Sequence, residues 1–458
     1  MKKRASGPSG RVITLEHTSK VLAGNPLGDP HVRTLDVWLP PQYDEPRSRN
    51  RRFPVVYDLV GFTGSGRAHT AWRAFDENVP ERAARLVHER RMGPLIIVFP
   101  DCFTALGGNQ YINSSAIGRY ADYLTREIVP FVDRELRTLA SREHRGCFGK
   151  SSGGYGAMIH AMKYSRYWGA IANHSGDAFF EQVYGADWPN TLDELAKFRR
   201  PKLAPGARNV AKAAAVAGYS GRDDGRIARF LEHVWQKERP GSGEVHALMN
   251  LAMAASYDPD PRAPNGFRVP YNLETGELLP ERWKRWREHD PVNLVARCAR
   301  SLRTLRGIFI DCGWRDQYHI HYGTRILAAR LAEAGVAHRY EEFDDNHSDI
   351  DYRMDVSLPL FRALVAGYLE TAGGVLNAAE RAHLGFAGKM MTYENGIRFL
   401  TDYLQGDTYY RIRRPRQNVD RCRAQFALVM AIERNLDAMA RVVDRKSTRL
   451  NSSHVALS

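Results

Sequence analysis

Strand and helix signals alternate along most of this chain, and that alternation limits the folds open to it. Apolar, β-branched runs at 53–60, 95–101 and 303–313 each lead into a loop rich in glycine or aspartate. Apolar residues recur at helical spacing within 115–136, and 324–335 is helical in composition. Parallel strands need long crossover connections, usually helices. We therefore expect an α/β fold with a mostly parallel sheet and helices on both faces.

The alternation is interrupted between residues 177 and 294, where tryptophan, proline and charged residues are frequent. Helical pieces such as LDELAKFRR and SGEVHALMNLAMAAS occur there, beside the irregular loop DPDPRAPNGF. We expect a mostly helical insertion over the sheet. Such an insertion would act as a lid that shapes a substrate pocket.

Composition excludes several classes of partner. The formal net charge is +14, but lysine and arginine are scattered along the 458 residues and form no recognisable nucleic-acid module. No apolar run reaches the roughly 20 residues that span a bilayer, and no apolar segment follows the basic start MKKR. The five cysteines suggest no disulfide framework. We expect a cytoplasmic protein that binds neither nucleic acid nor membrane; the sequence does not reveal its oligomeric state.

The stretch HRGCFGKSSGGYGAM contains Gly-Lys-Ser and raises two hypotheses. A phosphate-binding loop of the form G-x-x-x-x-G-K-[ST] would need a first glycine where His144 stands, so that pattern fails. The same residues match G-x-S-x-G, from Gly149 to Gly153, between a predicted strand and a helix. This context predicts a nucleophile elbow centred on Ser151.

A nucleophilic serine needs a base and a third group that orients the base, and in this fold they follow in the order Ser, Asp, His. Asp316 comes just after the strand run that ends near 313, and His347 follows the next predicted strand. Carboxyl ends of parallel strands are where α/β sites gather. Asp311 is the alternative acid, but it lies inside the strand run. Backbone N–H groups of Phe62 and Ser152 are the candidate oxyanion hole.

Other polar residues near the motif are weaker candidates. Candidate substrate contacts are Lys150, Tyr155 and His174. Alternatively, Lys150 is a solvated surface residue and His174 is a turn histidine hydrogen-bonded to its neighbours. His319 and His321 lack the H-x-x-x-H spacing and the cysteine partner typical of zinc sites. We expect no metal and no organic cofactor.

The chain resembles the Putative esterase family of α/β-hydrolases, which includes esterase D-like S-formylglutathione hydrolases, enterochelin esterases, feruloyl esterases and mycolyltransferases. The resemblance covers about residues 10–360 and rests on FPVVYDLVGFTGSG, LIIVFPD, LTREIVPFVDREL, GKSSGGYGAM, ANHSGD, DCGWRD and FDDNHSDIDYR. It implies an α/β-hydrolase domain over 1–360 with Ser151 as nucleophile, Asp316 as acid and His347 as base. Where relatives often have His-Gly before the oxyanion residue, this chain has Val60-Gly61.

The implied reaction is hydrolysis of a small-molecule carboxylic ester or thioester through an acyl-enzyme on Ser151. Two alternatives on the same fold are an acyltransferase and a catalytically silent binding protein. A phosphotransferase fusion is the third choice. The natural ester is not readable from the sequence.

The C-terminal part differs in character. Residues 361–443 are helical in composition and resemble the C-terminal helices of aminoglycoside phosphotransferase-like kinases of the N-acetylhexosamine kinase type. No kinase catalytic loop and no nucleotide loop precede them, so we expect no complete kinase. DRKSTRLNSSH resembles the translation of a sequencing-adapter oligonucleotide, and we expect residues 444–458 to be a non-native tail. A genuine fusion and an artificial joining both remain open.

Overall fold

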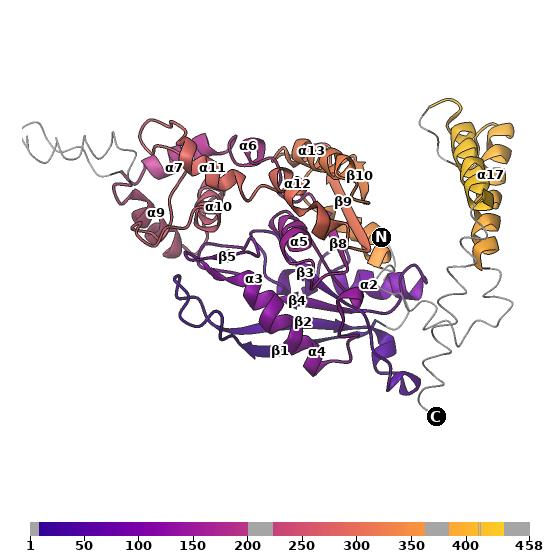
Figure 1. Cartoon of the computed structure of the whole chain (residues 1–458), viewed down its shortest axis with the longest axis horizontal. Coiled ribbons are helices and arrows are strands. Elements are labelled where there is room, and N and C mark those ends of the chain that lie inside the picture. The colour runs from indigo at the N-terminus through magenta and orange to yellow at the C-terminus, as the bar shows by residue number, and fades with distance from the viewer. Residues whose placement is uncertain (1–8, 200–222, 362–383, 411, 413, 435–458) are drawn as a thin grey trace, which may run out of the picture. The chain divides into compact units, whose positions relative to one another are not determined.

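The computed structural model describes residues 9–199, 223–361, 384–410, 412 and 414–434, and it divides into two compact units, residues 1–365 and 366–458 (Figure 1). The first unit is built on a sheet with the strand order β1-β2-β4-β3-β7-β8-β9-β10. The strands are β1 (Arg11–Thr18), β2 (Val32–Leu39), β3 (Val55–Leu59), β4 (Ile96–Pro100), β7 (Arg145–Lys150), β8 (Ala170–His174), β9 (Gly307–Gly313) and β10 (Arg339–Phe343).

Six neighbouring strands, from β4 through β3, β7, β8 and β9 to β10, are parallel. The strands β1 and β2 form an antiparallel pair, and β2 pairs antiparallel with β4. The prediction of a mostly parallel sheet is therefore confirmed, with an antiparallel edge that the sequence did not predict. A separate two-stranded ribbon consists of β5 (Asn113–Ser114) and β6 (Gly118–Arg119).

The helices of the first unit lie between the strands, in the order expected. They are α1 (Arg67–Thr70), α2 (Val79–His88), α3 (Tyr120–Asp122), α4 (Val129–Glu135), α5 (Ser152–Lys163), α6 (Phe180–Val183), α7 (Trp188–Ala196), α9 (Arg226–Trp235), α10 (Ser242–Tyr257), α11 (Pro280–Arg287), α12 (Pro291–Leu302), α13 (Ile320–Glu333) and α14 (Met354–Leu360). A π-helical turn, η3 (Tyr123–Ile128), joins α3 to α4. Short 3-10 turns are η1 (Pro41–Tyr43), η2 (Pro46–Ser48), η4 (Arg142–His144) and η5 (Ile350–Arg353).

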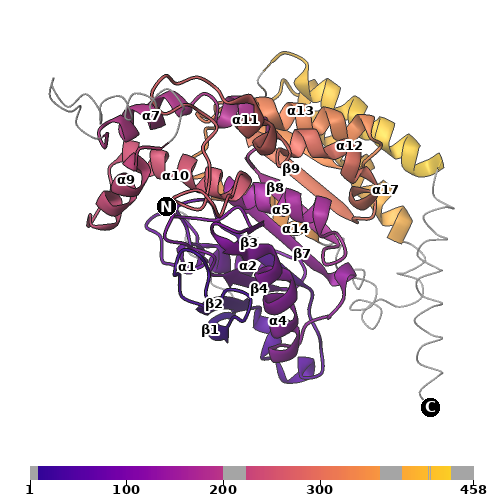
Figure 2. The ribbon, with the colours of Figure 1, turned by 60° about the vertical axis from the view of Figure 1, so that its left-hand side comes forward.

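Two apolar cores cover the two faces of the sheet, because successive side chains of a strand point to opposite faces. In β3, Val55 and Tyr57 enter the core shared with α4, α5, α12 and α13, whereas Val56 enters the core shared with α2 and α14. Each fully buried apolar side chain of this size stabilises the fold by about 1.5–3 kcal/mol. Helices thus lie on both faces, as predicted, and α12 and α13 lie side by side next to β9 (Figure 2).

The segment between β8 and β9 is helical in its described part. Its last helix, α12, packs against α5 and α13 and so belongs to the layer that covers the sheet. The helices α7, α9, α10 and α11 form a group of their own at one side of the sheet (Figure 1). Their aromatic rings pack together: Tyr257 and Trp286 have ring centroids 5.3 Å apart, and Trp188 and Trp286 5.9 Å apart. A lid role for this group stays a prediction.

The described part of the second unit consists of α17 (Leu384–Leu404) and helical residues 417–434. Asp402 connects them, because its carboxylate accepts hydrogen bonds from the Tyr409 N–H at 2.6 Å and from Asn418 Nδ2 at 2.8 Å. Lys389 and Glu433 form an ion pair of 2.6 Å. The remaining residues of 361–443 and the predicted tail at 444–458 lie mostly or wholly outside the described residues. Among the described helices, none is both long and apolar enough to cross a membrane.

Candidate active site

Ser151 occupies a strained turn between β7 and α5. Its φ of 58° and ψ of −125° lie outside the regions that ordinary residues favour. The positive φ falls on Ser151 itself, and the flanking glycines allow a close approach of backbone instead. A Cβ on Gly149 would lie 2.2 Å from the Leu59 carbonyl oxygen, and one on Gly153 would lie 1.7 Å from it. The pattern therefore lets the elbow press against the end of β3.

Asp316 and His347 form a buried pair just past the ends of β9 and β10. His347 Nδ1 is hydrogen-bonded to Asp316 Oδ2 at 2.7 Å, and the two residues are 8% and 2% exposed. The other carboxylate oxygen, Oδ1, accepts the Tyr318 N–H at 2.9 Å. The Tyr318 ring stands edge-on to the imidazole, with centroids 4.9 Å apart. The imidazole is thereby held in one orientation, with Nδ1 on the carboxylate side.

Backbone contacts fix the two loops that carry this pair against each other. The Trp314 N–H donates to the Phe343 carbonyl and the Arg315 N–H to the Asp345 carbonyl, each at 3.0 Å. The His347 N–H donates to Gln317 Oε1 at 2.9 Å. The acid and the imidazole therefore belong to one rigid loop assembly.

The parallel order of β7, β8, β9 and β10 brings Ser151, Asp316 and His347 to the same edge of the sheet. Burial lowers the pKa of Lys150, the residue before Ser151, while the charges of Asp351, Asp349 and Asp316 act to raise it. Asp316 thus lies within electrostatic reach of the elbow. Because carboxylates already compensate Lys150, its part as a substrate contact stays a prediction.

The loop after β3 lies over the elbow. A Cβ on Gly61 would be 3.5 Å from the Ser151 Cβ and from the Lys150 carbonyl oxygen. Phe62 is buried, and its carbonyl oxygen would lie 2.0 Å from a Cβ on Gly108. This packing fixes the backbone that bears the candidate oxyanion donor Phe62. Ser152, the other candidate donor, begins α5.

His174 and Asp311 form a second histidine–carboxylate pair, on strands β8 and β9. His174 Nδ1 is hydrogen-bonded to Asp311 Oδ1 at 2.6 Å and Nε2 to Ser357 Oγ at 2.8 Å, while Arg353 donates to Asp311 Oδ2 at 2.8 Å. His174 is buried with both ring nitrogens occupied, so it is not available as the substrate contact that the sequence suggested. Asp311 is equally engaged, which leaves Asp316 as the acid beside His347.

Tyr155 is also enclosed. Its side chain is 0% exposed and its hydroxyl donates to the His289 carbonyl oxygen at 3.1 Å. The polar atom of Tyr155 is thus used inside the protein, and a substrate contact of this residue stays a prediction.

Two residues that sequence reasoning did not single out lie against the elbow. Gln110, in the loop after β4, donates from Nε2 to Ser152 Oγ at 2.8 Å and to Asp177 Oδ2 at 3.4 Å. Asp177, three residues beyond β8, also accepts from the Tyr184 hydroxyl at 2.7 Å. Position just after a strand end is the signal that could have found Asp177, whereas Gln110, ten residues beyond the end of β4, has no such signal.

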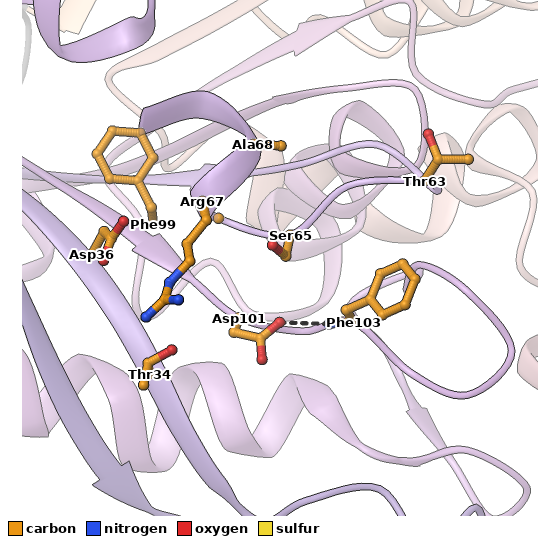
Figure 3. Close-up of a pocket in the computed structure, with 10 residues that line it drawn as sticks. Thr34, Asp36, Thr63, Ser65, Arg67, Ala68, Phe99, Asp101 and Phe103 are labelled. Carbon is orange, nitrogen blue, oxygen red and sulfur yellow. Dashed lines mark hydrogen bonds between the residues drawn. The ribbon is translucent and has the colours of Figure 1, made fainter. Parts of the chain in front are cut away.

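A cavity of about 660 Å³ lies on the other flank of the loop after β3 (Figure 3). It is lined by the hydroxyl residues Thr34, Thr63 and Ser65, by Asp36, Gly66, Arg67, Ala68 and Asp101, and by Phe99 and Phe103. The Arg67 side chain extends into the space between Asp36 and Asp101 (Figure 3). This polar cavity borders the loop of Phe62 and lies at the same edge of the sheet.

Within the described residues, no group of three or more His, Cys, Asp or Glu side chains is arranged to hold a metal ion. His319 and His321 have ring centroids 6.4 Å apart.

Comparison with known proteins identifies the family. The model of the Esterase family, described as Putative esterase, matches residues 30–357. The chain belongs to this family. Membership supports the hydrolysis of carboxylic esters as its reaction class. The match ends before residue 361, so the kinase-like character of 361–443 stays a prediction.

Individual relatives are more distant. "Esterase Rv1288" of Mycobacterium tuberculosis strain H37Rv is 30% identical over 165 residues, which cover 34% of this chain and only 32% of that protein. A solved ferulic acid esterase is 18% identical, with 78% of this chain and 98% of that chain covered and a TM-score of 0.46. An S-formylglutathione hydrolase from Agrobacterium tumefaciens is 18% identical, with 79% and 97% covered and a TM-score of 0.43.

Proposed function

We propose that this esterase works through an acyl-enzyme on Ser151, with His347 as general base and Asp316 as the residue that orients it. The observation that carries the proposal is the buried Asp316–His347 pair at 2.7 Å, on loops at the same sheet edge as the strained turn of Ser151. A serine hydroxyl is a weak nucleophile on its own, and an adjacent oriented imidazole is the usual means of activating it.

In the acylation step, His347 Nε2 takes the Ser151 proton as Oγ attacks the ester carbonyl carbon. The carbon–oxygen bond to the alcohol breaks, and the imidazolium returns its proton to the departing alkoxide. A water molecule then attacks the acyl-enzyme, with His347 again taking and returning a proton. Asp316 stays ionised and stabilises the imidazolium.

The N–H groups of Phe62 and Ser152 would hold the oxygen that becomes negative in each tetrahedral intermediate. Ser152 stands at the start of a 12-residue helix, whose dipole favours negative charge at that end. Donors of this kind are worth about 10²–10³ in kcat each in serine hydrolases. No step requires a metal or an organic cofactor.

The test is covalent labelling together with turnover, on the full chain. Wild type, Ser151→Ala and the matched control Ser175→Ala, a buried serine just after β8, are offered a fluorophosphonate probe and p-nitrophenyl acetate. We expect labelling and hydrolysis in wild type and in Ser175→Ala, and neither in Ser151→Ala. An unlabelled wild type that binds esters would indicate the silent binding protein, and acyl-enzyme that accumulates until an alcohol is added would indicate the acyltransferase.

A further inference from the structure

Gln110 and Asp177 form a polar wall beside the elbow. They come from loops after β4 and β8, and they meet in the hydrogen bond of 3.4 Å between Gln110 Nε2 and Asp177 Oδ2. The same Nε2 reaches Ser152 Oγ at 2.8 Å, so the wall touches the residue that follows the nucleophile. Met253 of α10 closes the group, with its sulfur 2.9 Å from Gln110 Nε2.

Asp177 lies within electrostatic reach of the imidazole proposed as base. Burial raises the pKa of the Asp177 carboxyl, and among the charges that act on it are those of His347, which lowers the pKa, and Asp316, which raises it. The Tyr184 hydroxyl, itself 3.3 Å from the Tyr257 hydroxyl, donates to Oδ2. The carboxylate thus stands between the catalytic edge of the sheet and the aromatic residues of the insertion.

The wall contains hydrogen-bond acceptors that have no partner among the residues that the structure describes. Gln110 is 1% exposed, and within these residues its Oε1 is a buried atom without a hydrogen-bond partner. Within the described residues, the hydrogen bonds to the Asp177 carboxylate both fall on Oδ2, which leaves Oδ1. Exchanging the oxygen and nitrogen of the Gln110 amide would set an oxygen against the Asp177 carboxylate, so the assigned orientation is the favourable one. A buried acceptor left unpaired costs about 1–3 kcal/mol, which favours a ligand that supplies a donor.

We infer that Gln110 and Asp177 bind a hydrogen-bond donor, a hydroxyl or an ammonium group, carried by the ester substrate. The inference rests on the proposed function at Ser151 and deepens it, because it names the substrate class: esters with a hydroxyl or amino substituent close to the scissile carbonyl. A site built to hydrogen-bond such a group discriminates strongly against the analogue that lacks it, since the acceptors are then left unpaired.

The experiment compares esters of nearly equal shape in two series. In the acyl series, methyl glycolate and methyl glycinate are compared with methyl propionate. In the alcohol series, 2-hydroxyethyl acetate is compared with propyl acetate. For wild type we expect kcat/KM to favour a donor-bearing member at least about tenfold in one series, as a hydrogen bond to a charged acceptor allows. The acyl series also separates hydroxyl from ammonium recognition.

Variants then assign the preference to the wall. Asp177→Asn keeps the shape but turns an amide N–H₂ toward the donor, and we expect the preference to fall to within about twofold. Gln110→Met, which removes Oε1 at similar volume, should weaken it. Tyr184→Phe removes a donor to Oδ2 but leaves the free acceptors, and Asp36→Asn makes the same chemical change in the cavity of Figure 3; both should keep the preference.

Three results would overturn the inference. The first is a wild type without preference in either series, and the second is a preference unchanged in both Asp177→Asn and Gln110→Met. The third is an equal loss of kcat/KM on all five esters in these two variants. The wild-type comparison decides even where a variant does not fold. Fluorophosphonate labelling of Ser151 is measured in parallel. If Ser151 is labelled but the wild type shows no preference for donor-bearing esters, only this inference is contradicted. If Ser151 is not labelled, the proposed function is contradicted.

Discussion

Two buried histidines at the same edge of the sheet are each paired with an aspartate, and they differ in what the second ring nitrogen does. His174 contacts Asp311 at 2.6 Å and His347 contacts Asp316 at 2.7 Å. Nε2 of His174 is bound by Ser357, whereas the hydrogen bond to the His347 ring within the described residues is the one at Nδ1. A carboxylate partner orients an imidazole, but only an open second nitrogen allows it to accept a serine proton. The first pair is structural in geometry, and the second is suited to catalysis.

The largest difference should appear when each histidine is removed. We expect His347→Ala to lower kcat for p-nitrophenyl acetate by at least about 10⁴-fold, because it removes the proposed base. His174→Ala should instead lower the free energy of unfolding by about 3–5 kcal/mol, because it leaves the buried Asp311 without one partner. Urea unfolding and steady-state kinetics measure the two quantities. An equal loss of kcat in folded His174→Ala would erase the distinction.

Substitution of the two paired aspartates should show the same difference between activity and stability, with smaller effects. Asp316→Asn is expected to lower kcat by about 10³–10⁴-fold, since an amide favours the wrong imidazole tautomer. Asp311→Asn weakens contacts to both His174 and Arg353 and should cost about 3 kcal/mol of stability, with kcat of the folded enzyme nearly unchanged. A pH profile of kcat adds a check, because only Asp316→Asn should alter it.

The sequence predicted the catalytic edge better than its surroundings. Ser151, Asp316 and His347 could be predicted as a group because each stands just after a strand signal, which is a local pattern. The partner of Asp311 was not readable, because His174 lies 137 residues away and only the β8–β9 register brings the two together. The wall residue Gln110 was missed for the same reason, since its significance depends on contacts with Ser152, Asp177 and Met253, which are 42, 67 and 143 residues away in the sequence.

The antiparallel edge was also missed. Burial alternates along β1, as its sequence RVITLEHT suggests, so a period-two pattern was present. Strand β2 is buried on both faces over most of its length and gives no such alternation. The sequence segments that precede β3 therefore lacked a common signature, although the alternating β-α order beyond it was clear.

Another buried histidine, whose hydrogen-bond partners within the described residues include no carboxylate, extends the comparison to pH. His160 accepts from Trp168 Nε1 at 3.1 Å, and its Nε2 is hydrogen-bonded to the Tyr111 carbonyl at 2.9 Å. Burial lowers its pKa to about 4. As the pH falls, this histidine becomes protonated near pH 6.5 in the unfolded chain but only near pH 4 in the folded chain. The free energy of unfolding therefore falls as the pH falls through this window.

We expect this histidine to remove about 2 kcal/mol of stability between pH 7 and pH 5. His160→Gln should reduce the loss by that amount, whereas substitution of the exposed His31 by glutamine should not. Urea unfolding of the three proteins at both pH values is the measurement. A pH dependence unchanged in His160→Gln would show that other groups, such as His289, whose pKa burial also lowers to about 4, account for it.

The smallest effect should come from removing the hydrogen-bond partner of His174 Nε2. Ser357→Ala removes the hydroxyl, 2.8 Å from His174 Nε2, and leaves that buried nitrogen without a partner, so we expect a loss of about 1–2 kcal/mol in the free energy of unfolding. The exposed Ser348 provides a matched alanine control that should change stability by less than about 0.5 kcal/mol. In Ser357→Ala the His174 pair acquires the open nitrogen of the His347 pair, yet His174 is a residue of strand β8, whereas His347 stands on the loop after β10. Unchanged kcat and unchanged fluorophosphonate labelling would therefore show that an open, oriented imidazole is necessary but not sufficient, and that the loop position of His347 past the strand end supplies the rest. A second labelled site in Ser357→Ala would contradict that conclusion.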